Sequence, residues 1–191
     1  MKILIAGAGK VGYNIAKNLM IRHEVIVIDQ NEEAITNIQE HLDVLALNGN
    51  IENPHILQTL PQEIDLFIAV TDMDEVNLLS SLIIDSVLHV KKKIIRLKNH
   101  FFDNDHIKGK LAIDEMIFPY VDAADPFKYI VDFPYIRNVK TFKHTKGLLV
   151  STLLPEHFEM VMIEHWREKT DQRLVVAGIE RDEKFFVPHS T

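Results

Sequence analysis

Short runs of apolar, β-branched residues alternate with longer segments whose apolar residues recur at helical spacing over the first 118 residues. The runs predict strands at 2–6, 24–28, 43–47, 65–70, 93–97 and 114–118. The longer segments predict helices at 10–21, 31–40, 54–60, 74–89 and 100–109. This alternation is typical of an α/β protein with a doubly wound parallel sheet, and we expect the Rossmann-like strand order 3-2-1-4-5-6.

The alternation stops after Phe118, where prolines and aromatic residues follow one another closely. Because proline interrupts regular elements, we predict a connector or crossover helix at 119–137 with at most a short helix, at about 127–133. Beyond it the pattern predicts a small α+β segment. Its expected elements are strands at 139–143, 148–153, 174–179 and 184–187 and a helix at 155–169. The predicted domains are thus 1–118, the connector 119–137, and 138–191.

Composition narrows the possible functions. The chain has 191 residues, no cysteine and a formal net charge of −7. The absence of cysteine excludes disulfides, thiolate metal sites and a cysteine nucleophile. Net negative charge disfavours a nucleic-acid partner, and no apolar run approaches the ~20 residues that a membrane helix needs. We therefore predict a cytoplasmic protein.

A glycine-rich loop is the sharpest local motif. Residues Gly7, Ala8, Gly9, Lys10, Val11 and Gly12 form a GxGxxG sequence between the first predicted strand and the first predicted helix. Asp29 ends the next predicted strand, which completes the fingerprint of a dinucleotide site. In this motif the backbone and the helix N-terminus hold the phosphates, while the acidic residue accepts hydrogen bonds from the ribose.

Asp29 also bears on which ligand binds. Its carboxylate repels a 2′-phosphate, so the sequence favours NAD(H) over NADP(H). The alternative is a vestigial fold that binds no ligand. A phosphate-binding P-loop is excluded because Tyr13 and Asn14 follow Gly12 where Lys and Ser/Thr are required.

The sequence Thr71-Asp72-Met73-Asp74-Glu75 directly follows a predicted strand. We expect Thr71 or Asp72 to cap helix 74–89 and the cluster also to face the ligand. A hard cation held by Asp72 or Asp74 is the weaker alternative. No spacing typical of a transition-metal site or a catalytic nucleophile appears, and the Tyr13–Lys17 pair lies in the wrong helix for a dehydrogenase, so we predict no catalytic residues.

Helix 74–89 carries apolar residues around most of its circumference. A helix that covers a single sheet face needs only one apolar stripe. We therefore predict a subunit interface on this helix, with burial under the C-terminal segment as the alternative.

Several segments together resemble one known family. MKILIAGAGKVGYNIAKNL at the start, VIVID at 25–29, LNGN at 47–50 and IAVTDMDEVNLLSSLI at 68–83 are similar to the Trk/Ktr-type potassium-uptake regulators. These carry an RCK (TrkA-N) domain. IDEMIFP at 113–119 resembles the end of that domain, although Tyr120 stands where a Glu is common. Segment 138–191 looks like the start of the family's C-terminal (TrkA-C) domain, so we expect a piece of a longer regulator.

The resemblance implies a role and further site residues. It implies a non-enzymatic, cytosolic homo-oligomeric ring that binds a nucleotide and gates a potassium channel or transporter at the inner face of the membrane. It places Asn48, Thr71, Asp72 and Arg96 in the crevice, with Arg96 facing a phosphate while the lysines near it (Lys91, Lys92, Lys93, Lys98) stay solvated. NAD(H) or ATP/ADP fits such a crevice. The rivals are a small NAD-dependent oxidoreductase and an oligomeric nucleotide-binding module with another partner.

Overall fold

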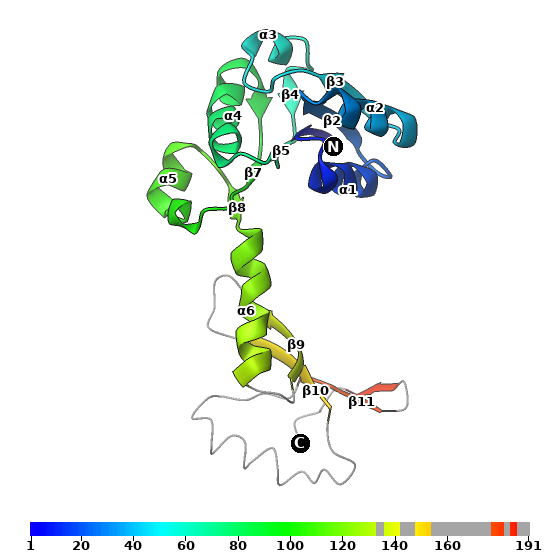
Figure 1. Cartoon of the computed structure of the whole chain (residues 1–191), viewed down its shortest axis with the longest axis vertical. Helices are drawn as coiled ribbons and strands as arrows, with labels where there is room; N and C mark the ends of the chain where they lie inside the picture. Colours follow the sequence, from blue (N-terminus) through cyan, green and yellow to red (C-terminus); the bar gives the residue numbers. More distant parts are fainter. Residues whose placement is uncertain (133–135, 142–147, 154–176, 182–183, 187–191) are drawn as a thin grey trace. The chain divides into compact units, whose positions relative to one another are not determined.

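The structure is a computed structural model that describes residues 1–132, 136–141, 148–153, 177–181 and 184–186 (Figure 1). The chain divides into two compact units, Met1–Asp132 and Phe133–Thr191. Each unit is described by itself.

A six-stranded sheet forms the centre of the first unit. Its strands are β1 (Lys2–Ala6), β2 (Glu24–Asp29), β3 (Leu45–Asn48), β5 (Leu66–Ala69), β7 (Lys93–Arg96) and β8 (Glu115–Ile117). They lie in the order β3-β2-β1-β5-β7-β8, and every neighbouring pair is parallel. Numbered within this sheet alone, the order is 3-2-1-4-5-6, so the predicted doubly wound fold is confirmed.

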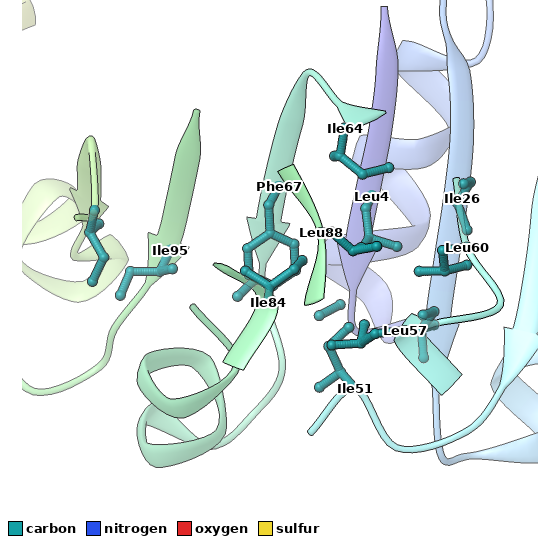
Figure 2. Packing of buried hydrophobic residues seen from close by; sticks show 14 of the residues in the cluster. Leu4, Ile26, Ile51, Leu57, Leu60, Ile64, Phe67, Ile84, Leu88 and Ile95 are labelled. Carbon is teal, nitrogen blue, oxygen red and sulfur yellow. The ribbon is translucent and has the colours of Figure 1, made fainter. Parts of the chain in front are cut away.

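Helices cover both faces of the sheet. On one face lie α1 (Lys10–Leu19) and α2 (Glu32–His41), and on the other lie α3 (Pro54–Leu57) and α4 (Asp74–Val87). The first unit also contains η1 (His100–Phe102), α5 (Asp105–Lys110) and α6 (Pro119–Asp132). Alternate residues of β1 enter different cores: Ile3 and Ile5 pack with residues of α1 and α2, whereas Leu4 packs with residues of α3 and α4. Figure 2 shows this second core, where Phe67 of β5 lies beside Ile84 of α4. Burial on both faces explains why the strands read as continuous apolar runs.

A second, two-stranded sheet was not predicted. Glu63–Ile64 (β4) pairs in parallel with His89–Val90 (β6). Asp65 lies next to it, where its carboxylate accepts hydrogen bonds from Lys91 Nζ at 2.6 Å and from the Lys2 backbone N–H at 2.8 Å. The Lys91 bond, with the Lys2 N–H second, lowers the pKa of Asp65, and the same bond to Asp65 raises the pKa of Lys91. Strands this short carry too few residues for a periodic signal.

Lys93 departs from the expectation that the lysines near Arg96 stay solvated. It is only 3% exposed, and its ammonium forms an ion pair with Asp85. The same ammonium donates to Ser81 O at 3.0 Å and Leu111 O at 2.9 Å. A buried ammonium is tolerated because these three acceptors replace its water. The prediction was wrong for Lys93 because strand alternation points this side chain at α4.

The connector also differs from its prediction. Instead of a short helix near 127–133, a continuous helix α6 runs from Pro119 to Asp132. Pro119 starts it without loss because the N–H groups of the first turn have no intrahelical acceptor. The helix continues through Pro126, so the expectation that proline would prevent a long element here was wrong.

The second unit contains two antiparallel strand pairs among its described residues. β9 (Ile136–Thr141) pairs with β10 (Leu148–Thr152), and β11 (Ile179–Arg181) pairs with β12 (Lys184–Phe186). The predicted helix 155–169 and residues 174–176 of the predicted strand 174–179 lie outside the described residues. In the described part of the chain, no helix is both long enough and apolar enough to cross a bilayer.

Candidate functional site

A cleft of about 540 Å³ opens where β1, β2, β5 and β7 end. Its size lies within the range of small-molecule sites, and the carboxyl edge of a doubly wound sheet is where such sites form. Eight of the eleven predicted site residues line the cleft: Gly7, Gly9, Lys10, Val11, Asp29, Thr71, Asp72 and Arg96. Ala8, Gly12 and Asn48 lie beside the cleft, where they contact residues that line it: Asp29 for Ala8 and Asn48, and Gly7 for Gly12.

The three glycines of the loop have different surroundings. Gly7 has φ +111°, and a Cβ there would lie 3.0 Å from Thr71 N and from Val70 C. A Cβ on Gly12 would lie 1.8 Å from the Gly7 carbonyl oxygen. A Cβ on Gly9 would meet nothing within 4 Å. Gly7 and Gly12 therefore let the loop, α1 and β5 pack closely, while Gly9 faces open space inside the cleft.

The N-terminus of α1 points its unpaired donors into this space. Gly9 is its N-cap and no side chain caps the helix. The first N–H groups of a helix have no intrahelical acceptor, and the helix dipole makes this end attractive to an anion. The arrangement fits a phosphate group, with Gly9 leaving room for it.

Asp29, at the end of β2, bonds to the glycine loop. Its Oδ2 accepts a hydrogen bond from the Ala8 N–H at 2.6 Å, and its Oδ1 accepts one from the Asn31 N–H at 2.8 Å. A carboxylate has about four acceptor positions, so two remain for the hydroxyls of a ribose. Asn48 Nδ2 donates to the carbonyls of Asp29 at 3.3 Å and Gln30 at 3.1 Å. Ala8 and Asn48 thus hold Asp29 in place.

Asn77 is a positioning residue that the sequence analysis did not single out. It is fully buried, and its Oδ1 accepts from the Thr71 N–H at 2.9 Å and from the Thr71 hydroxyl at 2.7 Å. Its Nδ2 donates to Thr71 O at 3.1 Å and to Arg96 O at 2.8 Å. One amide therefore ties α4 to the ends of β5 and β7. The sequence did contain a sign of this role: Asn77 is a polar residue at a position of the helix that must be buried against the sheet.

The predicted cap of α4 was wrong. The N-cap is Met73, and no side chain makes a capping bond. Asp74 is 5% exposed, and its two carboxylate oxygens accept from the backbone N–H groups of Lys98 at 2.8 Å and Asn99 at 2.9 Å. Asp72 instead pairs with Arg96 at 3.0 Å. Among the described residues, no group of three or more His, Cys, Asp or Glu is arranged to hold a metal ion.

Comparison with known proteins finds relatives over nearly the whole chain. The TrkA-N domain model matches residues 3–119. The Trk system potassium uptake protein TrkA homolog of Archaeoglobus fulgidus is 38% identical over 98% of this chain and 43% of its own length. The trkA homolog 1 of Methanosarcina mazei is 30% identical over 99% of this chain and 48% of its own. The chain thus spans less than half the length of these relatives.

Solved structures share the fold. The GsuK RCK domain has a TM-score of 0.63 at 17% identity, over 96% of this chain and 40% of that one. The GsuK channel bound to NAD has a TM-score of 0.55 at 18% identity, over 64% and 22% of the two chains. At these identities the likeness establishes architecture alone.

Proposed function

Because the chain belongs to the TrkA-N domain family, we propose that it is part of a nucleotide-sensing regulatory subunit of a potassium-transport system. The observation that carries the proposal is the open N-terminus of α1 beside Gly9, with Asp29 bonded to the glycine loop in the same cleft. The relatives are named as potassium uptake proteins, which favours a regulator over an enzyme.

NAD(H) is the first candidate ligand and ATP or ADP the second. Each presents phosphate for the α1 N-terminus and a ribose diol for Asp29. A related channel, GsuK, has been solved bound to NAD, which supports a dinucleotide. The rival function, a small NAD-dependent oxidoreductase, predicts steady substrate-dependent oxidation of NADH, and an absorbance assay would reveal it.

The ligand must bind two conformations with different affinity to act as a signal, because equal affinity shifts no equilibrium. The side chain of Asn77 supplies a route for that signal. It belongs to α4 and bonds to Thr71, which lines the cleft. We infer that occupancy of the cleft biases the position of α4.

The exposed side of α4 is the proposed contact between subunits. Leu79 and Leu82 are 44% and 52% exposed, whereas Asn77, Ser80 and Ser81 are buried. A helix with polar residues inside and leucines outside is unusual for a solvent-facing surface. We place a second copy of the chain there, in a ring on the cytoplasmic side of a membrane partner.

Leu82→Glu is expected to weaken self-association at least about tenfold, because it puts a charge in an apolar interface. The fold should survive, since Leu82 is half exposed. Sedimentation velocity over a range of protein concentrations measures the effect. Ile21→Glu is the matched control, because Ile21 is 75% exposed on a turn away from α4. Equal association of both variants and the wild type would remove α4 from the interface.

Asp29→Ala is expected to lower the affinity for NADH, NAD, ATP and ADP by about tenfold, the value of one or two hydrogen bonds to a charged group. Calorimetric titration of all four measures it. Asp29→Asn keeps an acceptor for the ribose and should lose less. Asp43→Ala, an exposed Asp outside the cleft, is the charge control. Unchanged affinity of Asp29→Ala for every nucleotide would remove Asp29 from the site.

A further inference from the structure

The guanidinium of Arg96, which lines the cleft, has a hydrogen-bond donor without an acceptor among the described residues. Its Nη2 donates to Thr71 O at 2.9 Å and to Asp72 Oδ1 at 3.0 Å. Its Nε is buried and has no hydrogen-bond partner in the described part of the chain. The side chain is 14% exposed, so most of this charge has lost its water. A buried donor without an acceptor is costly, which makes Arg96 a receptor for a further anion.

The present counter-ion of Arg96 is weakly held. The Asp72 side chain is 90% exposed, and its other cationic neighbour, Lys98 Nζ, is 4.0 Å from Oδ1. Lys98 Nζ bonds instead to the Asp72 backbone carbonyl at 2.6 Å. An ion pair with one partner in solvent contributes little, so Asp72 can leave Arg96 at small cost while its backbone stays in place.

Arg96 lies close to the glycine loop. The backbone of Val70 and Thr71 is in contact range of Gly7, at 3.0 Å from a Cβ built there. Arg96 bonds to the carbonyl of that same Thr71. Because the start of α1 and Arg96 line the same cleft, a ligand with one phosphate at the glycine loop can extend its next phosphate toward Arg96.

We propose that Asp72 is an internal anion that occupies Arg96 in the empty cleft and is displaced by a phosphate lying beyond the one at the glycine loop. The ligand class is a nucleoside polyphosphate with an ionised terminal phosphate. The inference rests on the proposed function, since it requires a nucleotide in this cleft. Asp72 thus competes with the ligand, and removing its charge strengthens binding, the reverse of the effect expected for Asp29.

The competition depends on the number of phosphates. AMP ends at the phosphate that the glycine loop holds, so it leaves Arg96 and Asp72 paired. ADP and ATP extend further and carry a terminal phosphate with up to two charges. NADH has a diphosphate that is esterified at both ends, so neither phosphate is terminal and each carries one charge; its gain is therefore smaller than that of ATP.

The experiment compares the wild type, Asp72→Asn and Glu75→Gln by calorimetric titration with AMP, ADP, ATP and NADH. Asp72→Asn is expected to raise the affinity for ATP about threefold to fivefold, the value of an exposed ion pair, and that for AMP less than twofold. Glu75→Gln removes the same charge three residues away on an exposed residue outside the cleft. Its affinities should stay within twofold of the wild type.

An Arg96→Gln background completes the test. There the gain from Asp72→Asn should disappear, because the two residues act as a pair. The Nε–H resonance of Arg96, assigned with the variant, should shift on addition of ATP and not of AMP. An equal gain for Asp72→Asn and Glu75→Gln, or a gain that persists without Arg96, would overturn the displacement and leave the proposed function standing. Absence of nucleotide binding in all variants would overturn both.

Discussion

Gly12→Ala is expected to lower the free energy of unfolding by about 2–3 kcal/mol. A Cβ at this position would lie 1.8 Å from the Gly7 carbonyl oxygen, a backbone atom that cannot rotate away. In an ordinary helix the same change stabilises by up to about 1 kcal/mol, because alanine has the higher helix propensity. The sign of the effect therefore reports the close approach of α1 to the glycine loop.

Urea denaturation of the wild type and the variant measures this difference, with Gly109→Ala as the control. Gly109 also lies in a helix, α5, and a Cβ there would meet nothing within 4 Å. Gly109→Ala should be neutral or slightly stabilising. A Gly12→Ala protein as stable as the wild type would show that α1 can move away from the loop without cost.

Gly9→Ala separates binding from folding within the same loop. The open space around Gly9 means that stability should fall by no more than about 1 kcal/mol, the cost of alanine at an N-cap. The methyl group would stand where the phosphate is proposed to lie, so nucleotide affinity should fall while the fold remains. The two alanine variants thus distinguish a structural glycine from one that makes room for a ligand.

Asn77→Ala is the second change with a large expected effect, a loss of about 2–4 kcal/mol of stability. It leaves the Thr71 N–H and the Arg96 carbonyl without this partner, and each buried group left unpaired costs about 1–3 kcal/mol. The Thr71 hydroxyl keeps Met73 O, at 3.2 Å, as an acceptor. Partial solvation of Thr71 reduces the sum. The free ends of β5 and β7 should also loosen, which lowers nucleotide affinity.

Chemical denaturation and amide hydrogen exchange at Thr71 measure these two consequences. Asn18→Ala is the control: Asn18 is exposed on α1, and its amide makes a single bond, to Asn14 O at 2.8 Å. Its stability should stay within about 0.5 kcal/mol of the wild type. If Thr71 exchanged no faster in Asn77→Ala, Asn77 would not be what fixes the end of β5.

The sequence predicted the sheet well because its central strands, β1, β2 and β5, are buried on both faces and so read as apolar runs. Sequence-based prediction failed where a general preference, such as proline outside helices or lysine in solvent, did not hold in the folded protein. Pro126 lies inside α6, and Lys93 is buried because Asp85 and two carbonyls receive its ammonium. The predicted cap of α4 failed for a similar reason, since Thr71 bonds to Asn77 and Asp72 pairs with Arg96 instead.

The sequence by itself determined the α/β class and the glycine loop with its acidic partner, because these depend on periodicity and on motif spacing. The strand order followed from the class, since a doubly wound sheet with this loop has a characteristic order. Only the tertiary structure decided what holds the cleft together. Thr71, Asn77 and Arg96 come from three elements, and their hydrogen bonds exist only after β5 and β7 pair. The ion pair of Arg96 with Asp72 was also decided by the tertiary structure, because two residues so far apart in the sequence form no recognisable motif.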